Sequence, residues 1–448
     1  MKRAARFTAA ILGCVLSMGS AVPAWAGENE MMDILIHKLV QKGVLSREDA
    51  REIKQEVSEE AARMAKARVG ETKDNTATFP GGAWLNTVKW SGDLRLRHET
   101  ERKQPAVDRN RERFRLRFGF VATPWDPLDI GVRLATGADS NPTSTNQTFT
   151  GSFDKKNIYV DQAYGKYTPW KDGSGILAGL SAIGGKMENP FVTIPEGVVW
   201  DGDVTPEGVA LQWKSQNPIP VLERLIPVKP FVNIGGFAIT EINADAGDPG
   251  VFGYQLGGDV DLPWWKATFQ PAVAYYNFTG IRGISTANVT TAPLGNTTVT
   301  KGAATYFAAD YNLIDVQAKL AVPDILGQPV ALLANYTYND DDKKNAAEEN
   351  VDDDGAYTAG IEVGKVTEKF GSWQLFGFRK RVETDAAFGA LSDSDFGGGG
   401  TNHKGYIMGA RMGLNKWASV GVKYFRTDEI EGTQNRFDTF QADLQLKY

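Results

Sequence analysis

The chain has 448 residues, of which 42% are hydrophobic and 23% charged, and its formal net charge at pH 7 is -6. This composition excludes an intrinsically disordered or collagen-like protein, and a weakly acidic chain lacks the basic surface that nucleic-acid binding needs. The mean hydropathy of -0.32, without a second long uncharged apolar run, excludes a bundle of membrane-spanning helices.

Residues 1–26 have the layout of a signal peptide. Three basic residues precede an uncharged stretch that runs from Phe7 to Ala26 and ends in small residues. This order predicts export and cleavage after Ala26, and a membrane-spanning anchor is the less favoured alternative because Gly, Ser and Pro interrupt the run. The only cysteine, Cys14, leaves with the signal, so the mature chain has no thiol for a disulfide, a metal or a nucleophile.

Residues 27–80 are predicted to be a periplasmic helical segment followed by a linker. From Met31 to about Arg68 the pattern is helical, with Gly43 as a stop and a capping-box-like restart at Ser46. The apolar stripe is narrow and spans few heptads, so it fits either a coiled coil or a short amphipathic hairpin that rests on another surface. Residues 70–80 have the composition of a linker.

After Trp90 the period of the sequence changes from helical to alternating. The segments Ser91–Glu99 and Arg113–Phe120 alternate apolar with charged residues, and the last segment, Phe440–Tyr448, repeats this design. A soluble β-sandwich and an outer-membrane barrel predict similar strands, because the first turns its charged face to water and the second turns it to a wet lumen. The lengths of the connections distinguish them.

Short and long connections alternate along residues 81–448, which we predict to be the barrel. The alternation holds if Gly302–Val322 is one long strand, bulged near Tyr311. This choice gives sixteen strands, and the first strand then begins, and the last strand ends, on the side of the short turns. Eighteen strands are the alternative. An even count with short turns at one end is typical of bacterial outer-membrane barrels. The predicted fold class is therefore all-β, a transmembrane antiparallel β-barrel with a short N-terminal α-helical segment.

The tryptophans test this layout independently. Of the ten tryptophans in the mature chain, only Trp200 falls away from the predicted short-turn end. The other nine are Trp84, Trp90, Trp125, Trp170, Trp213, Trp264, Trp265, Trp373 and Trp417. Amphipathic indoles concentrate at membrane interfaces, whereas a soluble sandwich has no reason to sort them to one edge.

Six strings are spread in order over the first half of the predicted barrel: Ser91–Arg97, Gly131–Gly137, Asn141–Gln147, Asp161–Tyr164, Gly185–Phe191 and Trp200–Gly208. Together with the predicted helical segment of residues 27–80 and the C-terminal aromatic residue, these strings resemble the bacterial "putative porin" family of outer-membrane proteins. The resemblance implies a water-filled channel for passive diffusion of small hydrophilic solutes and ions. It also implies a homotrimer in contact with outer-membrane lipid.

Six arginines are predicted to line the pore on the first three strands: Arg95, Arg97, Arg113, Arg115, Arg117 and Arg133. The third long loop, Glu188 to Glu207, holds five acidic residues and no basic one: Glu188, Glu196, Asp201, Asp203 and Glu207. We expect this loop to fold inward and form a constriction with a transverse field, which favours polar solutes and biases ion choice. The alternative is that the arginines pair with acidic residues of the lumen such as Asp93 and have only a structural role, while the loop stays outside the barrel.

Other candidate sites are weak. The acidic residues of 340–342 and 352–354 lack EF-hand spacing and predict a solvated loop, and Gly397–Gly400 predicts a flexible loop tip. The chain has three histidines, His37, His98 and His403, and only the last two are candidates for an external hydrolase.

We therefore predict an outer-membrane porin, with its helical segment in the periplasm, that has no cofactor and no enzymatic activity. Two alternatives come from other classes of protein. One is an outer-membrane anchor that links the envelope through the helical segment of residues 27–80, and the other is a barrel hydrolase.

Overall fold

The computed structural model describes residues 87–171, 175–219, 226–242, 247–289, 294–341, 354–433 and 435–448. The predicted signal peptide 1–26 and the predicted helical segment 27–80 lie outside these residues and stay predictions. The described residues belong to one compact unit. Within the described residues, no helix combines the length and apolarity needed to cross a bilayer.

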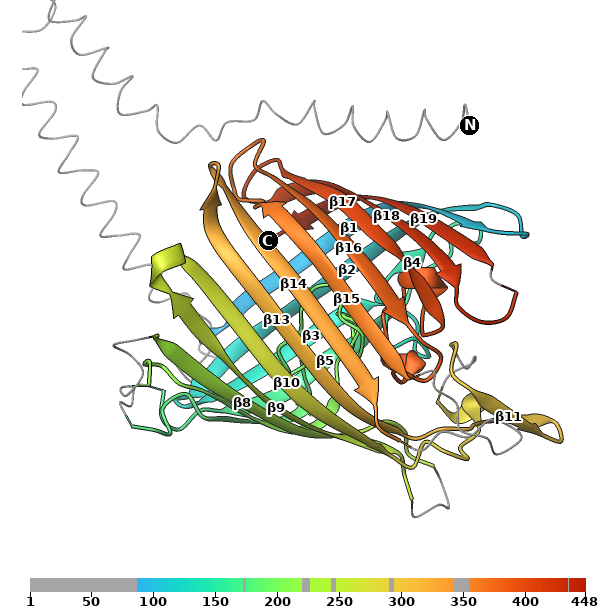
Figure 1. Ribbon diagram of the computed structural model, residues 1–448, viewed down its shortest axis with the longest axis horizontal. Helices are drawn as coiled ribbons and strands as arrows, with labels where there is room; N and C mark the ends of the chain where they lie inside the picture. Colours follow the sequence, from blue (N-terminus) through green and yellow to red (C-terminus); the bar gives the residue numbers. More distant parts are fainter. Residues whose placement is uncertain are drawn as a thin grey trace, which may run out of the picture. The chain divides into compact units, whose positions relative to one another are not determined.

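Sixteen antiparallel strands close into a β-barrel (Figure 1). They are β1 Lys89–Lys103, β2 Arg109–Trp125, β3 Leu128–Thr136, β5 Ile158–Tyr167, β6 Ser181–Lys186, β7 Glu207–Lys214, β8 Val228–Ala238, β9 Gly250–Leu262, β10 Ala267–Thr279, β13 Tyr311–Ile325, β14 Gln328–Asn339, β15 Gly355–Gly364, β16 Trp373–Val382, β17 His403–Gly413, β18 Ala418–Glu429 and β19 Arg436–Lys447. Closure comes from β1, which pairs with β2 on one side and with β19 on the other. The two-residue β4, Gln147–Thr148, only adds to β2 within a loop. The predicted fold class and strand count are confirmed.

The predicted single strand over Gly302–Val322 is wrong in its first part. The wall strand β13 begins only at Tyr311, and β11 (Thr298–Lys301) and β12 (Ala304–Phe307) form a separate two-stranded sheet. Gly302, with φ of +65°, lies in the tight turn between them, where a left-handed conformation favours glycine. The extra pair therefore belongs to the loop between β10 and β13, which is why the barrel count stays at sixteen.

The polarity of the wall is inverted relative to a soluble protein. On β13 the outward Ile314 and Val316 are 39% and 47% exposed, whereas the inward Asp315 and Gln317 are only 6% and 5% exposed. The same alternation recurs on β14, where Leu332 is exposed. Apolar residues outside and polar residues inside are what a membrane-spanning barrel requires, because only the lumen offers water or polar partners.

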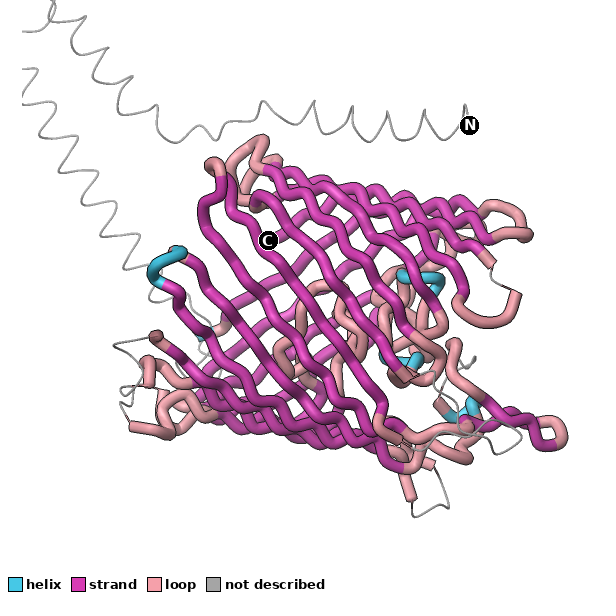
Figure 2. The backbone as a smooth tube through the Cα atoms, in the orientation of Figure 1, coloured by secondary structure: helices cyan, strands magenta, loops and turns pink. Residues whose placement is uncertain are grey.

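One end of the barrel carries short turns and the other carries the long loops, which we call the short-turn end and the long-loop end (Figure 2). Seven tryptophans near the short-turn end are 38% to 65% exposed: Trp90, Trp125, Trp170, Trp264, Trp265, Trp373 and Trp417. Trp213 lies near the end of β7 and donates its indole N–H to the carbonyl of Ile176 at 2.7 Å. Trp200 is buried in a loop, and Trp84 lies outside the described residues. This arrangement is a one-sided aromatic girdle.

A charge placed on the outer face tests the inverted polarity. Val316→Arg is expected to lower the free energy of unfolding by about 2–4 kcal/mol, the cost of Arg or Lys near the bilayer midplane. Urea titration in lipid vesicles, followed by tryptophan fluorescence, measures this change. The matched control is Thr268→Arg, whose position on β10 lines an inner cavity. Equal losses in the two variants would contradict the assignment of faces.

Candidate functional site

The loop between β6 and β7, residues 187–206, lies inside the barrel, where Figure 2 shows loop segments within the ring of strands. Inward amide side chains from three wall strands bind its backbone. The Val192, Ile194 and Val198 N–H groups donate to Gln255 (2.8 Å), Gln317 (2.9 Å) and Asn335 (3.1 Å), respectively. The backbone of a loop has no ladder partner of its own, so these amides supply the hydrogen bonds that a buried peptide group needs. The loop is therefore fixed along the wall at mid-strand height.

Two lysines extend this attachment. Lys423 of β18 forms an ion pair with Glu196 of the loop at 2.6 Å. Lys380 of β16, only 1% exposed, donates to the Gly197 carbonyl at 3.0 Å and pairs with Asp393 at 3.0 Å. A buried ammonium group is tolerated only when such partners satisfy it. We call Lys380 and Lys423, with these contacts, the lysine latches.

The loop between β16 and β17, residues 383–402, also packs inward. Its Ser394 N–H donates to the Asp201 carboxylate at 2.9 Å, and its Leu391 carbonyl accepts from the Asp201 N–H at 2.8 Å. The expected flexible tip at Gly397–Gly400 is wrong. A Cβ built on Gly400 would lie 2.0 Å from the Leu294 carbonyl oxygen, so this glycine permits a close approach of two loops.

Most of the predicted pore-lining arginines have carboxylate partners. Arg115 and Arg117 both pair with Asp93, at 2.8 and 2.6 Å. The other pairs are Arg113 with Glu99 at 3.3 Å, Arg97 with Asp443 at 2.7 Å and Arg133 with Asp161 at 2.5 Å. Cross-strand register causes this pairing, since Asp93 lies opposite Arg117 between β1 and β2. The arginines thus pair with carboxylates of the lumen, as the second alternative of the sequence analysis expects. Residues 187–206 lie inside the barrel, as the first alternative expects.

Arg95 differs from the other five. It faces Arg115 across β1 and β2, and its guanidinium donates to Asn146 at 2.7 Å. Within the described residues, no carboxylate lies within ion-pair distance of it, and its Nε has no hydrogen-bond partner. Arg95 is therefore the least neutralised cation of the arginine wall.

Of the five acidic residues predicted for the constriction, Asp203 approaches the arginine wall. It lies 3.6 Å from Arg115 and 3.7 Å from Arg117, and it accepts hydrogen bonds from Thr145. Glu196 faces the opposite wall at Lys423, and Asp201 lies between the two inward loops. Glu207 pairs with Lys186 at 2.8 Å at the start of β7, and Glu188 is exposed. The pore-lining and constriction roles of these residues stay predictions.

The carboxyl groups where the two inward loops meet differ in acidity. Burial, and then the neighbouring carboxylates of Asp393 and Asp203, raise the pKa of Asp201 well above its ordinary value. Burial would also raise the pKa of Asp393, but the Lys380 and Lys423 ammonium groups hold that pKa below its ordinary value. Asp393 thus keeps its charge next to the lysine latches, and Asp201 takes up a proton more readily.

Sequence analysis missed several of these residues. Asp393 and Asp395, for which the sequence predicts no role, lie in the loop between β16 and β17, and Asp395 is 3.3 Å from Arg97. Acidic residues in a polar loop look the same whether the loop turns outward or inward, so the sequence carries no signal for them. Lys380 shares its face of β16 with Phe376 and Phe378, so a pattern in which apolar residues face lipid would place it on the outside, and the sequence carries no signal for its inward position.

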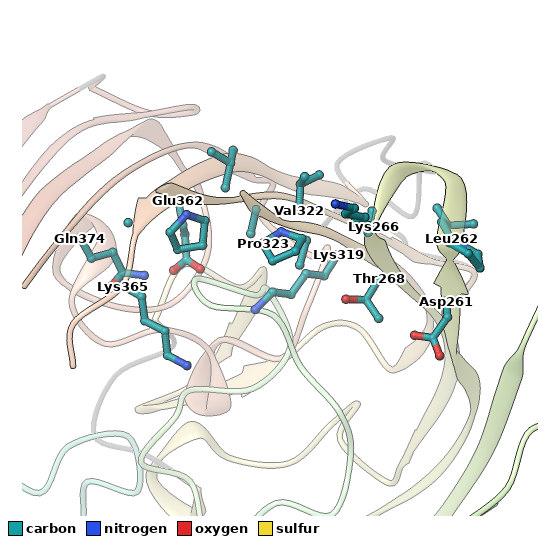
Figure 3. Close-up of a pocket in the computed structure, with 17 residues that line it drawn as sticks. Asp261, Leu262, Lys266, Thr268, Lys319, Val322, Pro323, Glu362, Lys365 and Gln374 are labelled. Atoms are coloured by element: carbon teal, nitrogen blue, oxygen red, sulfur yellow. The ribbon is translucent and has the colours of Figure 1, made fainter. Parts of the chain in front are cut away.

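Two open cavities lie in the barrel, one toward each end. The cavity toward the long-loop end has a volume of about 660 Å³ and is lined by ends of β3, β5, β7 and β8 together with Asp203. The cavity toward the short-turn end also measures about 660 Å³ (Figure 3). Figure 3 shows Lys319, Glu362 and Lys365 extending into it. In the part of the chain that the structure describes, these three side chains have no ion pair, so water must solvate them.

The candidate catalytic and metal-binding residues are dispersed. His98 faces outward on β1, with Nδ1 2.7 Å from Glu112 and Nε2 3.4 Å from the Thr100 hydroxyl, but that hydroxyl donates to Asn110 at 2.7 Å. His403 is on β17, against Phe396. The described residues hold no group of three or more His, Cys, Asp or Glu that could bind a metal ion. His37 and Asp342–Asp353 lie outside the described residues.

A family model with the description "Putative porin" matches residues 102–314 and 296–448. No curated protein matches the chain by sequence. Among solved structures, the fold is similar to Salmonella typhi OmpF in complex with daunomycin (12% identity, 81% of this chain and 97% of that chain, TM-score 0.44). It is also similar to the outer membrane channel DcaP of Acinetobacter baumannii (12%, 81% and 97%, TM-score 0.43) and to Pseudomonas putida OprB (11%, 84% and 98%, TM-score 0.44).

Proposed function

The chain belongs to the "putative porin" family, and we propose that it forms a water-filled channel through the outer membrane, through which small hydrophilic solutes and ions diffuse passively. The observation that carries this proposal is the pair of cavities that charged side chains line, Asp203 in one and Lys319, Glu362 and Lys365 in the other, inside a barrel whose outer face is apolar. Charged side chains without ion-pair partners in the described lumen need water, and continuous water is what a diffusion channel supplies.

We propose that residues 187–206 narrow this channel. Asp203 of the loop lies against Arg115 and Arg117, so the loop and the arginines together form one charged side of the narrowed passage, which Arg95, Arg97, Arg113 and Arg133 extend. The contacts of the loop with Gln255, Gln317 and the lysine latches support a fixed rather than a swinging constriction. Charged groups that line a narrow passage orient water and polar solutes, which lowers the barrier for hydrophilic solutes relative to apolar ones.

The proposal also includes homotrimer assembly and contact with outer-membrane lipid, as the family resemblance implies, and a periplasmic position for residues 27–80, as we predict from the sequence. The envelope-anchor alternative depends on those same residues, outside the described part. The hydrolase alternative is less favoured, because the Thr100 hydroxyl nearest to His98 donates its proton to Asn110 and not to the imidazole.

Liposome swelling tests the diffusion of solutes. Vesicles that contain the protein are expected to swell in isotonic pentose or hexose solutions at rates that fall as the sugar becomes larger, because passage is limited by the width of the constriction. Protein-free vesicles and vesicles with heat-denatured protein are the controls. Swelling rates equal to those of protein-free vesicles for every sugar would contradict the proposed function.

A further inference from the structure

Three cations gather on the outer face of the barrel near its long-loop end: Arg379 of β16, Lys404 of β17 and Arg426 of β18. The register brings them together around Tyr406, since Tyr406 lies opposite Arg379 on one side and opposite Arg426 on the other. The Arg379 guanidinium carbon lies 4.5 Å from the centre of the Tyr406 ring. We call these three residues and Tyr406 the outer cationic patch.

The alternation of the strands shows that the patch faces outward. The neighbours Lys380 and Thr427 are inward and almost completely buried, whereas Tyr406 is 51% exposed. None of the three cations has an ion-pair partner among the described residues. The nearby carboxylates of Glu383 and Asp428 pair instead with Arg381 (2.8 Å) and Arg436 (3.2 Å). Asp438 lies opposite Arg426 in the register but forms no ion pair with it.

Such a group of charges is unusual on this barrel. On several other strands, outward positions toward the long-loop end hold only uncharged residues: Gly236 of β8, Phe252 of β9, Asn277 of β10, Ile314 of β13 and Tyr336 of β14. Toward the short-turn end of β16–β18, the outward residues below the patch are apolar, and they include Leu375, Met408 and Val422. The patch therefore lies above a surface that is suited to acyl chains.

We propose that the outer cationic patch binds the phosphate groups of an acylated, phosphorylated glycolipid of the outer leaflet, of which lipid A is the available probe. Long cationic side chains at the rim of the hydrocarbon layer reach the lipid headgroups, and phosphate accepts strong charge-assisted hydrogen bonds from guanidinium groups. The acyl chains of the same molecule would cover the apolar residues below. The proposal does not depend on solute passage, because the patch is on the outside of the barrel.

Native mass spectrometry of the detergent-solubilised full chain with added lipid A tests the proposal. The variant Arg379→Gln, Lys404→Gln, Arg426→Gln is expected to bind lipid A at least tenfold more weakly than the wild type. The control Lys155→Gln, Lys369→Gln, Lys416→Gln removes the same charge elsewhere and is expected to bind normally. Replacing the patch arginines with Lys keeps the charge and should retain most binding.

The source of the interaction and the folding of the variants need separate measurements. Dephosphorylated lipid A is expected to bind the wild type as weakly as phosphorylated lipid A binds the Gln variant, and millimolar inorganic phosphate should not displace the lipid. Heat-modifiable migration on gels establishes that each barrel is folded. Equal lipid A binding by the wild type and the folded Gln variant would overturn the proposal. So would a Gln variant that loses its oligomeric state while it binds lipid normally, because a second copy would then cover the patch.

Discussion

Replacement of Arg113, Arg115 and Arg117 by Gln in one variant is expected to shift ion selectivity strongly toward cations. The substitution leaves the carboxylates of Asp93 and Asp203 without their arginine partners, whereas Glu99 loses Arg113 but keeps Arg111. A unit charge about 8 Å from a passing ion in water contributes about 0.5 kcal/mol. Three lost charges therefore change the energy of a cation by about 1.5 kcal/mol and that of an anion by about as much in the opposite direction, so the permeability ratio should change by more than about tenfold. Reversal potentials in a KCl gradient across a planar bilayer measure this ratio.

Two further variants make this result specific. Lys155→Gln, Lys369→Gln, Lys416→Gln removes three charges outside the arginine wall and is expected to leave the reversal potential unchanged. Asp93→Asn with Asp203→Asn removes two facing carboxylates and is expected to shift selectivity toward anions. If the arginine variant folds and its conductance and ion preference equal those of the wild type, the arginines are structural filling only.

Loss of the lysine latches is expected to have the largest effect on stability. In Lys380→Met the Asp393 carboxylate loses its ammonium partner inside the barrel, and removal of one partner of a buried ion pair costs about 3–5 kcal/mol. Lys423 is more accessible to water, so Lys423→Met should cost less. Because both lysines bind residues 187–206, the open channel of the double variant should also show larger current fluctuations than the wild type.

A control and a rescue separate latch loss from general damage. Lys319→Met removes a lysine that lines the cavity toward the short-turn end and is expected to change stability little. Glu196→Gln combined with Lys423→Met removes both charges of one pair and should recover most of the stability lost in Lys423→Met, as a double-mutant cycle would show. An undiminished free energy of unfolding in Lys380→Met would contradict the role of the latch.

The sequence predicts the wall of this barrel well and its interior poorly, for a physical reason. An alternating strand shows which residues share a face, so the outward position of Val316 and the inward position of Arg115 follow from the period of two. The same alternation wrongly predicts one wall strand over Gly302–Val322, because a short hairpin in a loop alternates with the same period of two as a wall strand. A local sequence pattern does not identify the strand with which a segment pairs.

The contacts inside the lumen depend on closure. Arg97 meets Asp443 only because the first strand pairs with the last, a contact between residues far apart in the sequence. The inward packing of residues 383–402 depends likewise on distant partners such as Arg97. The inward course of residues 187–206 was expected as one of two alternatives. The hydrogen bonds of this loop to Gln255 and Gln317 could not be predicted, because they depend on the positions of strands that follow later in the chain.

Single-channel recording in a planar lipid bilayer tests the central claim, that the barrel encloses a continuous hydrated path. Purified, folded protein is expected to insert in discrete steps, each adding a conductance that rises with salt concentration. Protein whose barrel is intact by circular dichroism and heat-modifiable migration, and which inserts into the membrane without any conductance step, would contradict it.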